Sequence, residues 1–311
     1  MTPYRIAAYA CGFALIAASA SARIERNVEK TFQVQPGVTV KITTSGGDIK
    51  VIPSSETTVK IVATEHVRAG SEAEADDVLK NLDLDFSQSG NEVSAVAQYH
   101  GDSGWHWGGT PVVVDFTVSV PPGASANLKT SGGSITVGDI QGSLRARTSG
   151  GNLRIGSIGG EVDAETSGGN VDLAQGGGKT RLSTSGGNIT ADRIVGPAEL
   201  RTSGGNIKVD AVDNTLDAST SGGDVRAEFD GALKGDCVLK TSGGQVRATV
   251  DKAAAFHLEA STSGGEVDAS GLTITIDHGG PGKSSLSGSV NGGGPLLRLA
   301  SSGGDIKVST H

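Results

Sequence analysis

The sequence predicts an all-β protein, a single-chain β-solenoid in which coils of about 18 residues stack with their strands in parallel. The tripeptide Ser-Gly-Gly occurs ten times, and the six copies from Ser131 to Ser221 follow one another at intervals of 18 residues. Polar and apolar residues alternate on both sides of each copy, as in strands with one buried face. Aromatic residues make up only 4% of the chain, against 48 glycines, which suits thin stacked coils better than one large core.

Residues 1–22 have the composition of a signal peptide. The apolar run 6–18 is 13 residues long, too short to span a bilayer, and residues 20–22 (Ala-Ser-Ala) are small enough for cleavage. We therefore expect an exported mature chain that begins near Arg23 and has no membrane span. Its expected location is the periplasm, the cell surface or the extracellular space. Cys237 would then be the one remaining cysteine, and its inward register predicts a buried, unreactive thiol.

Residues 23–130 are expected to form an N-terminal cap and the first coils, with an irregular insertion, because the period lapses between Ser45 and Ser131. Ser71 and Glu74 fit a capping box, which predicts one short helix at 71–82. Such a cap would stop open strand edges from pairing with another molecule. The strands expected in this region are 38–42, 49–52, 59–64, 83–88, 92–99 and 112–120.

Residues 131–311 are expected to form the regular solenoid, with two short strands in each coil. The Gly-Gly pair is expected to adopt positive φ, because the chain reverses direction within a few residues. Asparagine follows the pair in four successive coils, which predicts a structural column of amides that hydrogen-bond along the stack, although a ligand-binding row is the alternative. Residues 279–294 are read as a glycine-rich insertion before a last coil at 296–309.

Three features of the sequence resemble one known family. They are the repeated Thr-Ser-Gly-Gly-polar-apolar segments, the strand that runs into Val-Pro-Pro-Gly at residues 120–123, and the closing Ser-Gly-Gly-Asp-Ile at residues 302–306. With these motifs the chain resembles the bacterial "putative adhesin" family of exported β-solenoid domains over nearly all of its mature length. The resemblance implies the fold and an adhesin-like role. Its motifs are turns, so it implies no catalytic residues.

The outward aspartates are the candidates for a carbohydrate-active β-helix enzyme, which would use two carboxylates as acid and base. Other residue types replace them between coils, so a solvated charged face is the favoured interpretation. The sequence shows no ligand spacing that indicates a metal or another cofactor. The aspartates concerned are Asp163, Asp172, Asp210, Asp217 and Asp224.

Trp105, His106 and Trp107 form the one local cluster that points to ligand contact. Tryptophans at a loop tip can stack on sugar rings or enter a partner's pocket. The alternative is that they fold back and plug the end of the solenoid. The same segment brings His100 near His106, but two histidines alone do not make a metal site.

These observations favour an exported, non-enzymatic β-solenoid that acts as an adhesin-like or cell-envelope structural or binding protein. Its expected partner is a cell-surface glycan or an envelope protein. The net charge of −8 argues against nucleic acid as a partner. A carbohydrate-active enzyme and a periplasmic interaction partner in envelope signalling are the competing hypotheses.

Overall fold

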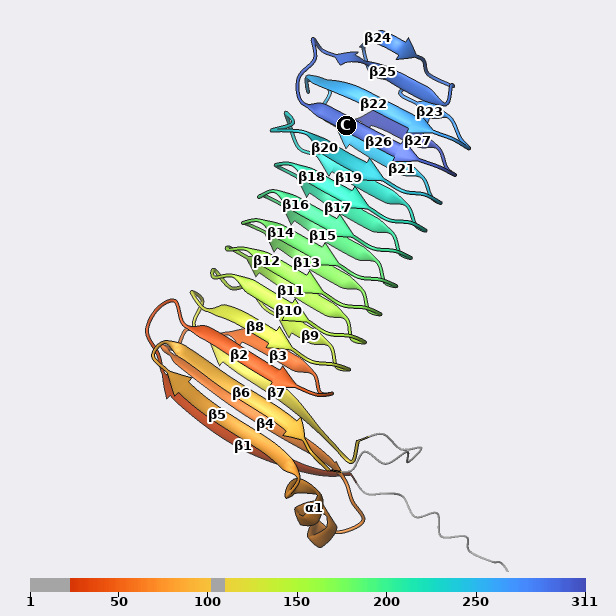
Figure 1. The fold of residues 1–311 in the computed structure, drawn as a ribbon. Coiled ribbons are helices and arrows are strands. Elements are labelled where there is room, and N and C mark those ends of the chain that lie inside the picture. Colours follow the sequence, from red (N-terminus) through yellow and green to blue (C-terminus); the bar gives the residue numbers. More distant parts are fainter. Residues whose placement is uncertain (1–22, 102–109) are drawn as a thin grey trace, which may run out of the picture.

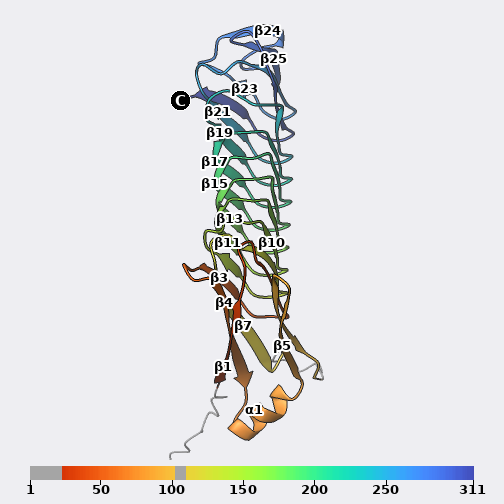
Figure 2. The same ribbon diagram turned by 90° about the vertical axis from the view of Figure 1, so that its left-hand side faces the viewer.

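The computed structural model describes residues 23–101 and 110–311. Their strands form two long sheets, one of 13 strands (sheet A) and one of 14 strands (sheet B), which are the two walls of a rod (Figures 1 and 2). The regular coils contribute to sheet A the strands β9 (Ile135–Val137), β11 (Leu153–Ile158), β13 (Val171–Gly176), β15 (Ile189–Ile194), β17 (Ile207–Val212), β19 (Val225–Phe229) and β21 (Val246–Val250). They contribute to sheet B the strands β8 (Ser125–Lys129), β10 (Leu144–Arg147), β12 (Val162–Glu165), β14 (Thr180–Ser183), β16 (Ala198–Arg201), β18 (Leu216–Ser219) and β20 (Cys237–Lys240).

Each regular coil places one strand in each sheet, and successive coils pair in parallel. Leu153 of β11 lies opposite Val171 of β13, one 18-residue period later, and Leu144 of β10 lies opposite Val162 of β12. Alternate residues of these strands are buried between the sheets, so the core is a thin layer of small and branched side chains. The predicted β-solenoid with two strands per coil is confirmed.

The glycines of the repeat do not adopt the positive φ that the sequence analysis expects. The described glycines with positive φ all lie elsewhere in the chain. The second glycine of the pair is required because the coils approach closely: a Cβ at Gly187 would lie 2.0 Å from the carbonyl oxygen of Gly169, its equivalent in the preceding coil. At Gly186 the nearest atom would be 3.5 Å away, so only the second position excludes a side chain.

A column of threonines fastens each turn to the coil before it. Thr184 is typical: its Oγ1 donates to the carbonyl oxygen of Gly169 at 2.8 Å and accepts from the backbone N–H of Gly187 at 3.2 Å. The side chain is 4% exposed. The hydroxyls of these residues therefore hydrogen-bond backbone carbonyl and N–H groups of the turns, which lie outside the strands and their ladders. The buried members of the column are Thr44, Thr130, Thr148, Thr166, Thr184, Thr202, Thr220, Thr241, Thr262 and Ser301.

The asparagines form the predicted column, but their side chains bond to backbone rather than to one another. Asn170 accepts through Oδ1 from the backbone N–H of Asn188, and Asn188 accepts in the same way from Asn206, both at 2.8 Å. Each amide oxygen thus forms a hydrogen bond between two neighbouring coils at the start of a strand. The column is a structural feature of the stack.

The N-terminal region places extra strands beyond the first coil. Its elements are β1 (Arg23–Gln33), β2 (Thr39–Thr44), β3 (Ile49–Pro53), β4 (Thr58–Arg68), α1 (Glu72–Leu79), β5 (Leu82–Ser89), β6 (Glu92–Tyr99) and β7 (Val112–Val120). Sheet A begins in the order β1-β4-β7-β3-β9 and sheet B ends in the order β8-β2-β6-β5. The first coil, β2 with β3, therefore does not lie at the end of the stack, because β6 and β7, which follow it in the sequence, pair with its outer side.

The helix and the strands expected in this region are present, and β1 is an additional strand. Ser71 caps α1, because its hydroxyl accepts from the backbone N–H of Glu74 at 3.2 Å. The carboxylate of Glu74 accepts from Gly70 at 2.8 Å, one residue earlier than in a regular capping box. Arg26 of β1 joins the sheet to the helix through ion pairs with Glu72 at 2.6 Å and Asp76 at 2.7 Å.

The C-terminal region inserts its last coil between two others. Its strands are β22 (Phe256–Thr262), β23 (Val267–Asp268), β24 (Ile274–Gly279), β25 (Ser285–Val290), β26 (Leu296–Ser301) and β27 (Ile306–Thr310). The strands β26 and β27 pair with β20 and β21 on one side and with β22 and β23 on the other. The coil that is last in the sequence is therefore not the last in space. The antiparallel strands β24 and β25 lie outermost in sheet B at this end.

Candidate functional site

Four basic residues form an uninterrupted line across four neighbouring strands of sheet A. Lys208 of β17 lies opposite Arg226 of β19, Arg226 lies opposite Arg247 of β21, and Arg247 lies opposite Lys307 of β27. Adjacent strands are about 4.8 Å apart, so the line repeats one positive charge at that interval along the rod. We call Lys208, Arg226, Arg247 and Lys307 the basic row.

The strand pattern places all four side chains on the outer face. After each Gly-Gly pair comes a polar residue, then an apolar, a variable and an apolar residue. The two apolar residues point into the core, as Ile207 and Val209 do, and the variable residue between them points outward. The basic row occupies this variable position in four coils that are adjacent in space.

The row places like charges next to one another, and only its two end members have a carboxylate partner among the described residues. Lys208 pairs with Asp210 at 2.8 Å and Lys307 with Asp268 at 3.5 Å. Within residues 23–101 and 110–311, the ion pairs within 4.0 Å leave the guanidinium groups of Arg226 and Arg247 without a carboxylate. Like charges directly opposite each other in neighbouring strands are destabilising. The row therefore costs stability, which is typical of a functional surface.

Shallow grooves run beside the row. One, of about 180 Å³, lies between the row and the column of turn residues, where Asn206, Asp224 and Gln245 form its other side. A second groove, of about 620 Å³, continues past Arg247 along Gln245, Asp305 and Glu266. A third groove, of about 330 Å³, lies on the same sheet at the coils that contain β9, β11, β13 and β15. The first two grooves adjoin at Gln245 and Arg247 and follow the row along the outer face of sheet A, whereas the third is separate from them.

The outer face of sheet B has a different charge pattern, in which basic and acidic residues alternate and pair. Arg145 pairs with Asp163 at 3.1 Å, and Arg181 pairs with Glu199 at 3.4 Å. Asp163 also forms an ion pair with Arg147 at 3.2 Å. The groove of about 420 Å³ on this side is lined by these paired residues. The arginines Arg145, Arg147 and Arg181 of sheet B therefore have carboxylate partners, which Arg226 and Arg247 of sheet A do not have in the described part of the chain.

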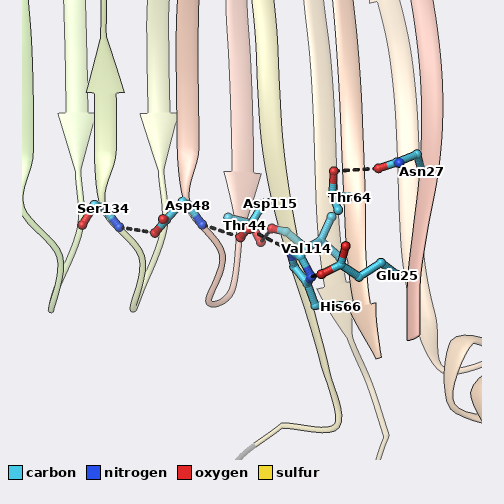
Figure 3. A network of polar contacts seen from close by, with 9 residues as sticks. All are labelled: Glu25, Asn27, Thr44, Asp48, Thr64, His66, Val114, Asp115 and Ser134. Carbon is cyan, nitrogen blue, oxygen red and sulfur yellow. Dashed lines mark hydrogen bonds and ion pairs between the residues drawn. The ribbon is translucent and has the colours of Figure 1, made fainter. Parts of the chain in front are cut away.

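A second polar cluster joins the cap to the solenoid (Figure 3). His66 of β4 lies between two carboxylates, with Nδ1 at 3.1 Å from Glu25 and Nε2 at 2.9 Å from Asp115. Asp115 also accepts from the backbone N–H of Asp48 at 2.8 Å, and Asp48 accepts in turn from that of Ser134 at 2.7 Å. These contacts link β1, β4, β7, β3 and the first regular coil, and they continue into the asparagine column. We therefore assign His66 a structural role.

The candidate ligand-contact residues Trp105, His106 and Trp107 lie outside the described residues. His100, which follows β6, pairs with Asp83 at 2.8 Å. Among the described residues no group of three or more His, Cys, Asp or Glu side chains is placed to hold a metal ion. Cys237 is buried, and burial raises the pKa of its thiol.

Most of the candidate aspartates have structural partners. Asp163 pairs with two arginines, Asp217 pairs with Arg201 at 3.2 Å, and Asp210 pairs with Lys208. Asp224 takes the place of an asparagine in the column and accepts from the backbone N–H of Gln245 at 2.8 Å. Asp172 lies exposed on sheet A, beside the third groove. Four of the five candidate aspartates therefore have a partner within the protein.

Sequence reasoning did not identify the basic row, although part of its signal is present. Lys208, Arg226 and Arg247 occupy the same position after their Gly-Gly pairs, so three members could be aligned. Lys307 belongs to the coil that is inserted between two others, and the sequence does not place it beside Arg247. The cluster around His66 has no signal in the repeat, because its residues come from strands outside the period.

The chain is similar to several solved structures at low sequence identity. No curated protein matches the chain. A solved structure from Bacteroides fragilis, named a "putative adhesin", is 12% identical, with coverage of 91% of this chain and 97% of that chain and a TM-score of 0.43. Another "putative adhesin", from Parabacteroides distasonis, is 11% identical, with coverage of 91% and 97% and a TM-score of 0.47. A protein of the same species named a "putative lipid binding protein" is 13% identical, with coverage of 90% and 96% and a TM-score of 0.39.

Within residues 23–101 and 110–311, no helix has the length and apolar character needed to span a membrane. The family described as Toastrack DUF4097 matches residues 124–309, which include the regular coils, the inserted coil and the basic row. The match confirms the fold class and the family resemblance inferred from the turns. The chain belongs to the Toastrack DUF4097 family.

Proposed function

We propose that the protein is an exported, non-enzymatic binding protein of the cell envelope, with an adhesin-like role, and that it holds an extended ligand along the outer face of sheet A. The observation that carries this proposal is the basic row, with two unpaired arginines at its centre and open grooves on its flank. Arg226 and Arg247 have no carboxylate within 4.0 Å among the described residues, so their guanidinium groups can donate hydrogen bonds to a ligand that lies in these grooves.

Binding without catalysis is supported by the shape of the surface and the roles of its carboxylates. The grooves are open along the rod, whereas glycoside hydrolysis needs two carboxylates placed on opposite sides of one bond. The paired aspartates Asp163 and Asp217 are held by arginines, and Asp224 is engaged by backbone. The adhesin names of similar solved structures agree with this proposal.

Export rests on the composition of residues 1–22, with the mature chain beginning near Arg23. Expression of the full chain with a C-terminal tag, followed by cell fractionation and N-terminal sequencing, tests this part. We expect the mature form outside the cytoplasm. A chain that keeps residues 1–22 and stays in the cytoplasm would refute export.

The binding role is tested by a glycan array probed with the mature chain, residues 23–311. We expect retention of at least one class of cell-surface glycan without release of reducing ends. Binding to no glycan would overturn the glycan-binding role, and release of reducing ends would replace it with an enzymatic one. A variant with Trp105→Ala and Trp107→Ala separates a contribution of that segment from one of sheet A, since only the former is lost in the variant.

A further inference from the structure

We infer that the basic row binds a linear acidic polysaccharide whose chain runs parallel to the rod and presents the carboxylates of one side to the row. The inference rests on the proposed function and adds the ligand's chemical class and its contacts. The spacing, the width and the chemistry of the row all favour this ligand.

The spacing of the row favours a polymer with one negative charge per short repeat. Its four positive charges come from four adjacent strands, about 4.8 Å apart. A polyuronate carries one carboxylate on each sugar ring, and successive carboxylates of an extended chain point to opposite sides. Those on one side therefore repeat at about two strand spacings, which keeps them in register with alternate members of the row. An extended acidic peptide places the side chains of one face about 6.6 Å apart, so its carboxylates lose register with the row within a few residues.

The width of the row favours a single thin chain. Asp210 and Glu228 lie two residues further along the strands of Lys208 and Arg226, and therefore on the same outer face. Asp224 and Asp305 lie on the other side, in the walls of the grooves. A membrane surface or a nucleic-acid duplex would press its own negative charges against these carboxylates. A single polysaccharide chain lies on the row without covering them.

The chemistry of the lining residues suits a sugar acid. A guanidinium group such as that of Arg226 or Arg247 can bind one carboxylate through two parallel N–H donors. Asn206 uses its Oδ1 to accept from the backbone of Asp224, which leaves its Nδ2 group outside that contact as a donor for sugar hydroxyls. The lining of both grooves contains no aromatic residue, whereas sequence-tolerant binding of single-stranded nucleic acid relies on aromatic stacking.

The experiment measures binding of the mature chain, residues 23–311, to polygalacturonate by biolayer interferometry at about 50 mM and about 300 mM NaCl. Neutral dextran, poly-glutamate, single-stranded DNA and vesicles that contain phosphatidylglycerol are the comparison ligands. The test variant carries Arg226→Gln and Arg247→Gln. The matched control carries Lys129→Gln and Lys240→Gln, which removes the same charge from exposed positions of sheet B.

We expect binding to polygalacturonate that weakens with salt, falls by about tenfold or more in the test variant and changes by less than about twofold in the control. A variant with Arg226→Lys and Arg247→Lys should recover part of the affinity. Equal losses in test variant and control, an unchanged test variant, or preferred binding to DNA, vesicles or poly-glutamate would overturn the inference. If neutral glycans bind on the array and polygalacturonate does not, the inference fails while the proposed function stands.

Discussion

The substitution Thr184→Val tests whether the threonine column holds neighbouring coils together. Valine keeps the shape of the side chain and removes the hydroxyl that joins Gly169 to Gly187. The carbonyl of Gly169 and the N–H of Gly187 then lose their partner at a site that is 4% exposed. Each unsatisfied buried group costs about 1–3 kcal/mol, and since the turn lies near solvent we expect a loss of about 2–4 kcal/mol in the free energy of unfolding.

Urea denaturation followed by circular dichroism measures this loss, with Thr184→Ser as the matched control. Serine keeps the hydroxyl, and Ser301 shows that it can make both bonds, to the carbonyl of Gly244 at 2.8 Å and from the N–H of Gly304 at 2.9 Å. The valine variant should have the lower midpoint at an unchanged denaturant dependence. Equal midpoints for the valine and serine variants would refute the role of the hydroxyl.

Three further predictions can be tested directly by substitution. Gly187→Ala should lower the melting temperature strongly and Gly186→Ala only slightly, because a Cβ would meet a carbonyl oxygen at 2.0 Å in the first and at 3.5 Å in the second; similar melting temperatures would contradict this. Burial raises the pKa of Glu65 above its usual 4.5, so the stability that the protonated form contributes is lost as pH rises through the raised value. Glu65→Gln, which cannot ionise, should therefore stabilise the protein more at neutral pH than at pH 4.5. An effect on the free energy of unfolding that does not depend on pH would contradict this. Arg247→Gln should raise the free energy of unfolding by about 0.2–1 kcal/mol, because it relieves repulsion within the basic row, whereas a loss of stability would mean that the row is structural.

The repeat region could be predicted almost completely from the sequence, because its period and its alternation both follow from the stacking of strands. The reason given for the glycines was wrong. Positive φ is a property of one residue's backbone, whereas the restriction at Gly187 comes from the coil beside it. A constraint of this kind becomes visible only when neighbouring coils are placed together.

The ends of the solenoid were less predictable, because chain order and spatial order differ there. The strand β1 carries Arg26 at an inward position, which hides its alternation, and this arginine is explained by its ion pairs with α1. The repeat pattern of the coil at 296–309 does not indicate which coils it pairs with. Its position between two earlier coils depends on how the chain returns after β24 and β25.

The candidate site was predictable only in part for the same reason. Trp105 and Trp107 were singled out because unusual residues are visible in a sequence, and they remain a prediction. The basic row consists of ordinary surface residues whose meaning depends on their neighbours across strands. Arg247 and Lys307 are 60 residues apart in the chain and lie opposite each other in adjacent strands.

Lysine footprinting tests the central claim most directly, because it locates the bound ligand on the surface. The mature protein is acetylated briefly with and without polygalacturonate, and the modified lysines are quantified by mass spectrometry. The account predicts that the ligand protects Lys208 and Lys307 and leaves Lys129 and Lys240 of sheet B as reactive as before. Equal protection on both sheets, or no protection of Lys208 and Lys307, would contradict it.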